Sequence, residues 1–494
     1  MKKLFAFLMA TMLMVSSVSV MAEEEKKETD KSTLPRVIIT TDMEVDDANG
    51  ILLTLMYANE MDIAGLVSTA GMWHFNGDGE HTLGEITSNY RCNVVDADKL
   101  KEFRPAEPGQ IARFIRTFYT EDYQYLSQNC PDYPTPEELM AVYAEGNIAF
   151  EGDVRFDTDG SNLIKAAMLD DDMRPLYIHH WGGSNTTCRA LLSIYEEYHG
   201  TDKWEEVLAK VVGKVVMVGE GEDYCVENTG VKDLFPGLKF GRMNSFFSYP
   251  SYGAAAGENA AYYVKGAYLL DAFKRNHGQI LGHLYLMDDG QVIYGEPMVA
   301  QYGLKTWVDW KELRPNYSNS SYLDFVPRWD MESYDWMCCQ FSSEYINVGL
   351  RQEVNNQPGN YTEMMFEELA ARADWAILPY EECNHAPVVS ADVLDFTAAS
   401  GATVSLSGSA TDPDGDELTI TFSVPAYACK YAAKTAEDGK VSEFEIPVTS
   451  DGSSAQVTIP EDAKAGDSFV VNMMVKDQAE RPMTRFAQFI ITVE

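Results

Sequence analysis

Short runs of β-branched residues alternate with amphipathic stretches along the chain up to about residue 385. Residues 36–41 (RVIITT) have the composition of a buried parallel strand, residues 47–59 repeat apolar side chains at helical spacing, and residues 61–69 read as the next strand. A second cycle follows, with a strand over 174–180, a helix over 186–199 and a strand over 214–218. Strands that alternate with helices predict an α/β fold, a mostly parallel sheet with flanking helices.

The pattern changes at Asn384-His385-Ala386-Pro387. Beyond this point, short β-rich segments are broken by Gly, Asp and Pro at the spacing of a β-sandwich. The predicted strands cover residues 403–408, 418–424, 456–459, 469–475 and 486–493. We therefore expect an α/β domain over residues 35–385 and an all-β sandwich domain over residues 386–494.

The N-terminus has the features of an export signal. Lys2 and Lys3 precede an apolar run over residues 4–15, and Val20-Met21-Ala22 supplies a cleavage point. The apolar run is too short to span a bilayer, which argues against membrane insertion. We expect a signal peptide over residues 1–22, a disordered spacer over residues 23–34, and a mature protein that is secreted or periplasmic.

Composition excludes some classes of partner. The formal net charge of −39 at pH 7 argues against nucleic-acid polymers as partners, because their phosphates would be repelled. It is compatible with an uncharged sugar or nucleoside. The eight cysteines form no C-x-x-C pair, which argues against a zinc site, and disulfides are compatible with export, with their pairing open.

Four acids follow the first predicted strand directly: Asp42, Glu44, Asp46 and Asp47. In open parallel sheets, ligands bind beyond the carboxyl ends of the strands. Carboxylates this close repel one another, and a hard cation such as Ca²⁺, which takes about six to eight oxygen ligands, relieves the repulsion. The alternative is that Asp46 or Asp47 caps the following helix while the other acids face solvent.

A second acidic segment, Asp412-Pro413-Asp414-Gly415-Asp416, lies in the predicted sandwich. Its Pro and Gly predict a turn. Its carboxylates are also chemically suited to calcium, but a solvated turn is the interpretation we prefer.

The spacing of Asp42 and Asp46-Asp47 matches the D-x-x-x-D-D signature of inosine-uridine-preferring nucleoside hydrolases. The chain resembles still more closely a family of secreted bacterial proteins with a nucleoside-hydrolase-like domain, often labelled cellulose-binding. The matching segments are residues 57–66, 174–176, 181–186, 371–375 and 384–387. The resemblance implies a nucleoside-hydrolase-like fold followed by an immunoglobulin-like domain.

The resemblance also implies roles for individual residues. Asp42 would bind calcium and take a proton from water, Asp47 would be a second metal ligand, and Asp46 would hold a ribose hydroxyl. The backbone carbonyl of Asn185 would complete this part of the site. The Gly182-Gly183 pair before it allows the chain to approach closely.

Two positions depart from the family pattern. The last metal ligand of the family is an aspartate far downstream, and here Glu296 corresponds to it, with Asp289 as the alternative. The asparagine that follows the second strand corresponds roughly to Met72, and His74 and Asn76 come soon after as predicted substrate-binding residues.

Two functions are consistent with these residues. The first is a calcium-dependent hydrolase of an N-glycosidic or related sugar bond, with Asp42 as the base that activates water. The alternative is a non-catalytic carbohydrate-binding protein, similar to cellulose-binding proteins, whose ligand is a sugar, a nucleoside or a polysaccharide. The intact Asp42, Asp46 and Asp47 favour the enzyme, whereas Met72 and Glu296 favour the binding protein.

Overall fold

The computed structural model describes residues 31–219, 222–241, 270–284, 362–426, 429–436, 442 and 444–494. The predicted signal peptide and the spacer up to residue 30 lie outside these ranges. Within the described ranges, no helix is both long enough and apolar enough to cross a membrane.

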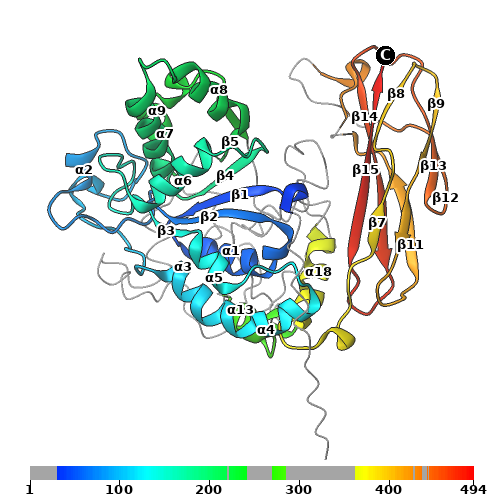
Figure 1. Cartoon of the computed structure of the whole chain (residues 1–494), viewed down its shortest axis with the longest axis horizontal. Coiled ribbons are helices and arrows are strands. Elements are labelled where there is room, and N and C mark those ends of the chain that lie inside the picture. The colour runs from blue at the N-terminus through cyan, green and yellow to red at the C-terminus, as the bar shows by residue number, and fades with distance from the viewer. Residues whose placement is uncertain are drawn as a thin grey trace, which may run out of the picture. The chain divides into compact units, whose positions relative to one another are not determined.

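A six-stranded sheet in the order β3-β2-β1-β4-β5-β6 forms the centre of the first part of the chain (Figure 1). Every pair of neighbouring strands is parallel. The strands are β1 (Arg36–Thr41), β2 (Asp62–Ser68), β3 (Tyr143–Glu145), β4 (Leu176–Trp181), β5 (Val215–Val218) and β6 (Lys239–Gly241). All six residues of β1 are buried, as a central strand covered on both faces requires. The predicted parallel α/β sheet is confirmed.

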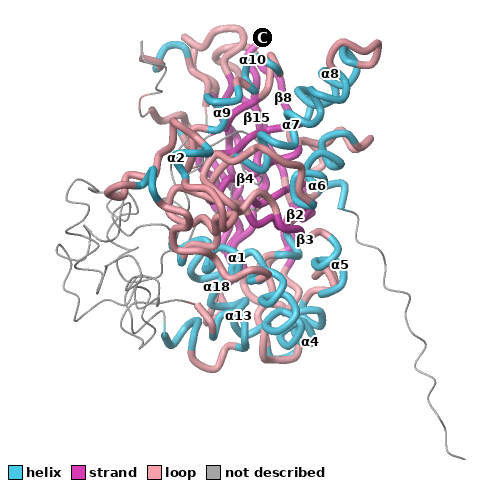
Figure 2. Tube along the Cα trace, turned by 90° about the vertical axis from the view of Figure 1, so that its left-hand side faces the viewer, coloured by secondary structure: helices cyan, strands magenta, loops and turns pink. Residues whose placement is uncertain are grey.

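Helices cover both faces of this sheet, and alternate residues of β1 point to opposite faces. Ile38 packs in one apolar cluster with α6 (Asp159–Leu169), α7 (Asn185–Tyr198) and α8 (Trp204–Lys214). Val37 and Ile39 pack in the other cluster. This second cluster includes α1 (Val45–Met56), α4 (Thr120–Asn129), α13 (Gly278–Gly282) and α18 (Thr362–Trp375). Figure 1 and Figure 2 show the strands between these two groups of helices.

The other helical segments of the first part are short. They are η1 (Lys31–Thr33), η2 (Ala58–Glu60), α2 (Leu83–Ile86), η3 (Ala97–Lys99), α3 (Gln110–Arg113), η4 (Phe114–Tyr119), α5 (Pro136–Ala141), α9 (Cys225–Thr229), α10 (Val231–Leu234), η6 (Leu270–Lys274) and η9 (Tyr380–Glu382). Most of these short helical segments lie in the long connections between the strands and the main helices.

The C-terminal part is built almost entirely of strands, mostly in antiparallel sheets (Figure 1). One sheet has the order β11-β14-β15-β8, another β12-β13-β9, and a third pairs β10 with β7. The elements are β7 (Val388–Ser390), β8 (Asp395–Ala398), β9 (Thr403–Ser407), β10 (Ser409–Thr411), β11 (Leu418–Ser423), η11 (Ala432–Lys434), β12 (Val448–Asp451), β13 (Ser454–Thr458), β14 (Ser468–Asp477) and β15 (Thr484–Val493). The predicted sandwich is confirmed, and its apolar core draws only on residues 389–493.

Polar contacts join the C-terminal strands to the preceding helices. Arg485 on β15 donates a hydrogen bond of 2.9 Å to Glu368 on α18 and one of 3.1 Å to Glu60. Asn384 donates one of 3.1 Å to Asp477 at the end of β14. Residues 31–494 cluster as one unit, and the predicted domain boundary at residues 385 and 386 stays a prediction.

Candidate functional site

The loop after β1 is tightly folded and places two acids in the interior. Met43 has a φ of 60°, a left-handed conformation that costs a non-glycine residue about 1 kcal/mol or more. The backbone N–H of Glu44 donates to Asp42 Oδ1 at 3.2 Å, and the Thr41 hydroxyl donates to Asp47 Oδ2 at 3.0 Å. Asp42 and Asp47 are each only 2% exposed. The alternative in which Asp42 faces solvent is therefore wrong.

Glycines of two other loops lie directly against Asp42. A Cβ atom at Gly71, after β2, would lie 2.1 Å from Asp42 Oδ2 and 3.3 Å from Glu222 Oε2. A Cβ atom at Gly182, after β4, would lie 2.9 Å from the Asp42 nitrogen and 3.1 Å from its Cγ. Only glycine leaves room for the carboxylate at these two positions. The ends of β1, β2 and β4 therefore converge on Asp42.

Two acids after β5 join this site, and sequence reasoning missed them. The backbone N–H of Glu222 donates to the carbonyl of Gly182 at 2.7 Å, which ties the β5 loop to the β4 loop. Asp223 is fully buried, and its Oδ1 accepts hydrogen bonds from the Ser184 hydroxyl at 2.7 Å and from the Cys225 N–H at 3.1 Å. Burial raises the pKa of Asp223. Their position just past a buried strand, like that of Asp42, was the signal that could have identified them.

Asn185 cross-links the loops around the site. Its side-chain Oδ1 accepts a hydrogen bond of 2.6 Å from Thr69, after β2. Its Nδ2 donates to the carbonyls of Asn147, after β3, at 2.8 Å and of Phe150 at 3.3 Å. The side chain is therefore engaged with the protein, and the metal-binding role implied for Asn185 would fall to its backbone carbonyl.

His74 and Asn76 differ in their surroundings. His74 is buried with its Nε2 4.0 Å from a carboxylate oxygen of Glu44, which also pairs with Arg104. Burial, with the Arg104 charge as a second cause, lowers the pKa of His74 well below its usual value, so its imidazole is neutral at pH 7. Asn76 bonds both backbone groups of Ala106, each at 3.0 Å. Their predicted contacts with substrate stay predictions.

The remaining predicted site residues are only partly within the described structure. Asp46 lies in the first turn of α1, and its side chain is outside the description. Glu296 and Asp289, the two choices for the last metal ligand, also lie outside the described residues.

Glu151 is a further buried acid near Asp223. It accepts hydrogen bonds from the backbone N–H groups of Arg91 and Cys92, the latter at 2.9 Å. Burial raises the pKa of Glu151 to about 8, with the charge of Asp223 as a smaller contribution in the same direction. The Glu151 carboxyl group therefore retains its proton near neutral pH.

The donor set around Asp42 fits a hard, oxygen-binding cation. Asp42 Oδ2 and Glu222 Oε2 both lie next to the position that a Cβ atom of residue 71 would occupy. Because Gly71 has no Cβ atom, two carboxylate oxygens approach the same space. Asp47, in the first turn of α1, adds another buried carboxyl group, whereas Glu222 is partly buried. Oxygen donors of this kind suit Ca²⁺ better than softer metals.

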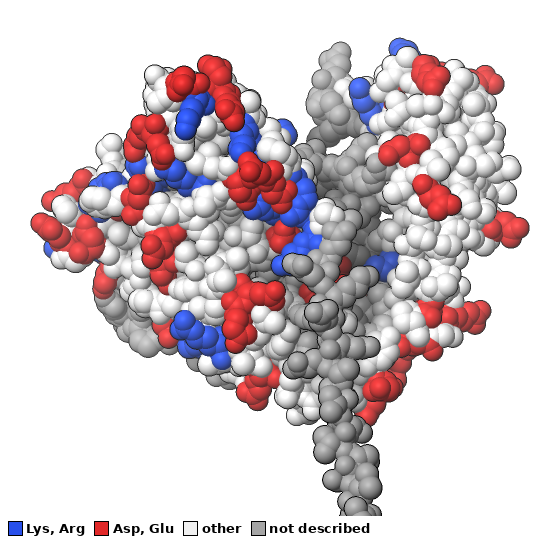
Figure 3. Space-filling view, in the orientation of Figure 1, with Lys and Arg blue, Asp and Glu red and all other residues white. Residues whose placement is uncertain are grey.

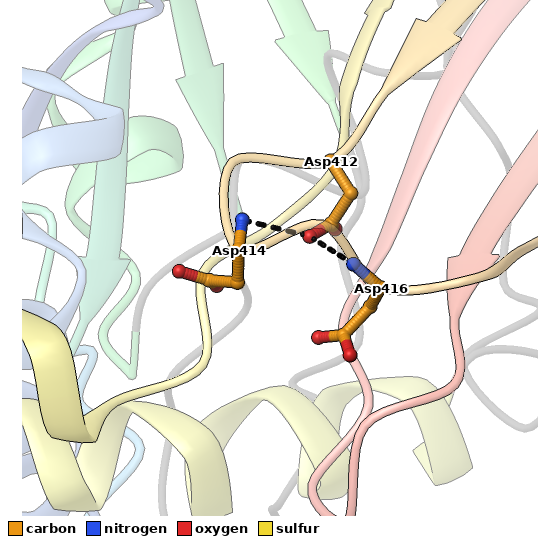
Figure 4. A group of neighbouring side chains, drawn as sticks. All are labelled: Asp412, Asp414 and Asp416. Atoms are coloured by element: carbon orange, nitrogen blue, oxygen red, sulfur yellow. Dashed lines mark hydrogen bonds between the residues drawn. The ribbon is translucent and has the colours of Figure 1, made fainter.

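The acidic turn of the sandwich is held by its own hydrogen bonds (Figure 4). Asp412 Oδ1 accepts the backbone N–H groups of Asp414 at 2.9 Å and of Asp416 at 3.1 Å. Asp414 accepts the backbone N–H of His385 at 2.6 Å. Of the described residues, these three aspartates alone form a group whose ligand atoms all lie within 4.8 Å of one another. Their hydrogen bonds match the predicted turn.

Acidic side chains are spread over the face of the molecule drawn in Figure 3, with Lys and Arg side chains among them. Some basic side chains of the protein form ion pairs with neighbouring acids, as Arg189 does with Asp157 and Glu196. Part of the negative charge of the protein is therefore paired with basic side chains.

Comparisons with known proteins match both parts of the chain. The family described as "Cellulose-binding Sde182, nucleoside hydrolase-like domain" matches residues 36–292, and "Cellulose-binding protein Sde0182, C-terminal domain" matches residues 403–493. No curated protein matches the chain significantly.

Among solved structures, a nucleoside hydrolase-related hypothetical protein from Saccharophagus degradans, described as associated with carbohydrate metabolism, aligns over 93% of this chain and 100% of its own. The TM-score is 0.62 at 22% sequence identity, which shows a shared fold. Titin domain M7 aligns over 22% of this chain and 96% of its own at 18% identity, with a TM-score of 0.15, too low to support a conclusion.

Proposed function

Because this chain belongs to the family of cellulose-binding Sde182 proteins with a nucleoside hydrolase-like domain, we propose that it is a calcium-dependent hydrolase of an N-glycosidic or related sugar bond. The observation that supports this proposal is the approach of the Asp42 and Glu222 carboxylates to one face of Gly71. These two carboxylates lie beyond the carboxyl ends of parallel strands, where open α/β sheets bind ligands.

The residues that would hold calcium are Asp42, Asp47, Glu222 and the backbone carbonyl of Asn185. Glu296, or Asp289 in its place, stays our proposal for the ligand from the downstream segment. When bound, the cation would neutralise the clustered carboxylates and make nearby water more acidic.

Asp42 is the proposed general base. Its Oδ1 accepts the backbone N–H of Glu44, which holds the carboxyl plane while Oδ2 is directed toward Gly71. A carboxylate held in this way takes a proton from water without first reorganising. Asp46 would bind a sugar hydroxyl. The neutral His74 can donate a hydrogen bond to the ligand or accept one from it. Asn76 can do the same if its hydrogen bonds to Ala106 break.

A non-catalytic carbohydrate-binding protein is the second candidate. It is favoured by the cellulose-binding description of both matching families. The same acids would then bind sugar hydroxyls without turnover. For either function, we propose that the N-terminal leader directs the protein to a secreted or periplasmic location.

The substitution Asp42→Asn separates these candidates. It preserves the size of the side chain but removes the proton acceptor, so we expect the release of sugar to fall by roughly 10²-fold or more while sugar binding persists. Asp202→Asn, an exposed aspartate between α7 and α8, is the matched control and should retain wild-type activity. The assay measures free sugar from nucleosides and glycosides, with calcium and with a chelator.

Two outcomes would change the proposal. If the wild type releases no sugar from any of these compounds with calcium present, the hydrolase is abandoned in favour of carbohydrate binding. If Glu222→Gln leaves calcium affinity unchanged, Glu222 is not a ligand.

A further inference from the structure

Two cysteines distant in sequence lie together beside the site. Cys188 is the fourth residue of α7, and Cys225 is the first residue of α9. Both side chains are fully buried in the same apolar cluster, and both are thiols in the structure. The Cys188 thiol is close enough to the Cys225 thiol to affect its protonation.

The surrounding contacts hold both cysteines in place. Cys188 Sγ lies 3.9 Å from the hydroxyl of Ser184, which donates to Asp223 Oδ1 at 2.7 Å. The same Asp223 oxygen accepts the backbone N–H of Cys225 at 3.1 Å. The Cys225 thiol also contacts the carbonyl of Gly152 at 3.8 Å. The start of α7 and the start of α9 are thus joined through one carboxylate, which holds the two cysteines in the same apolar cluster.

We propose that Cys188 and Cys225 form an intramolecular disulfide in the mature protein. In this reaction the two S–H bonds break and one S–S bond forms. The two electrons and two protons pass to a disulfide oxidant, either an oxidised thiol–disulfide oxidoreductase or glutathione disulfide, which is reduced to two thiols. The proposal assumes the export that the N-terminal leader predicts, because oxidising compartments are where such bonds persist.

The disulfide bond would form during folding, before the two sulfur atoms are buried. Thiol–disulfide exchange requires a thiolate, and burial raises the pKa of the Cys225 thiol well above its usual value. An oxidant also has no access to a fully buried sulfur. Oxidation therefore occurs during folding, and native protein that was folded in reductant should oxidise slowly.

The bridge would constrain the segment that carries the acids of the β5 loop. Between Cys188 and Cys225 lie α8, β5, Glu222 and Asp223. A cross-link from α7 to α9 limits the conformations of this segment in the unfolded chain and holds Asp223 against Ser184 in the folded one.

The decisive experiment compares full-length protein exported to an oxidising compartment with the same protein prepared in reductant. Free thiols are alkylated under denaturing conditions and the peptides are mapped without reduction. We expect the peptides of Cys188 and Cys225 to be joined in the exported protein and both to be alkylated in the reduced protein. Alkylation of both cysteines in the exported protein, or a bridge from either one to another cysteine, would overturn the proposal.

Thermal unfolding supplies a second measurement. Reduction of the exported protein should lower its Tm by about 5 °C or more. Cys188→Ser and Cys225→Ser should each remove this response to reductant, while Cys92→Ser, a substitution of another buried cysteine, should retain it. An undiminished response in either of the first two variants contradicts the bridge. Neither measurement depends on a ligand, so failure here and failure of the proposed hydrolase are distinguishable.

Discussion

At the scale of single residues, Gly71 lies where the Asp42 carboxylate needs space. We expect Gly71→Ala to displace this carboxylate, because the new Cβ would lie 2.1 Å from Asp42 Oδ2. Overpacking of this kind costs about 1–3 kcal/mol of unfolding free energy. Urea unfolding of the variant measures the cost.

The control for Gly71 is Gly213 in α8, where a Cβ would meet Met173 Cε at 3.5 Å. Gly213→Ala should be neutral or should stabilise by up to about 1 kcal/mol, since alanine favours helices. Equal stability of the two variants would show that Gly71 and Asp42 are not in close contact.

Glu151 should make stability depend on pH. Its pKa is raised from 4.5 to about 8 in the folded protein, so the folded state binds the proton more tightly than the unfolded state does. The stabilisation is fully present below about pH 4.5 and is lost as the pH rises toward 8. The unfolding free energy of the wild type should therefore decrease between pH 5 and pH 8. In Glu151→Gln this decrease should be smaller, by a few kcal/mol at most.

The measurement is urea unfolding at several pH values, with Glu137→Gln, an exposed glutamate on α5, as the control. The same pH dependence in both variants would mean that Glu151 is ionised in the folded protein at neutral pH.

At the scale of elements, α18 is anchored by one buried cation. Arg372 has no exposed surface; its Nε donates to Glu368 at 2.9 Å and its guanidinium also bonds Asn59 at 2.7 Å and pairs with Glu60. These contacts join α18 to η2, which precedes β2. The helix therefore owes its position to a polar network as well as to apolar packing.

Arg372→Leu should destabilise the protein by about 3 kcal/mol or more, because it leaves the buried Glu368 and the partly buried Glu60 with one cation fewer. Thermal and urea unfolding measure the effect. Arg275→Leu breaks an exposed pair with Asp271 and should change the stability by less than about 1 kcal/mol. Similar effects of the two substitutions would show that the network contributes little to the position of α18.

At the scale of the whole molecule, residues 386–494 contain a complete apolar core. Every residue of the cluster around Phe469, Val471 and Phe489 comes from this segment. We expect the isolated segment to fold cooperatively, as measured by circular dichroism during heating. A gradual transition without a cooperative midpoint would contradict the predicted domain boundary.

The complementary fragment should be less stable than the full chain. Residues 35–385 would lack Arg485, whose guanidinium bonds Glu60 and Glu368 beside the buried Arg372. Its Tm should therefore fall below the corresponding transition of the full-length protein.

Local sequence determined the main elements of both parts. The β-branched run of β1, the helical periodicity of α1 and α7, and the strand spacing of the sandwich are properties of neighbouring residues, and the structure confirms them. The short strands β3, β6, β7, β8, β10 and β12 were not predicted, because three or four residues carry too little periodicity. The position of Asp42 just past a buried strand was also readable from the sequence.

Only the tertiary structure decided which other groups lie beside Asp42. Glu222 meets it because the strand order β1-β4-β5 brings the ends of β1 and β5 to the same edge of the sheet, although they are far apart in the chain. The burial of Asp223 against Ser184, and the meeting of Cys188 with Cys225, follow from the packing of α7 and α9. Local periodicity specifies which face of an element is buried, whereas contacts between loops depend on how the strands are ordered.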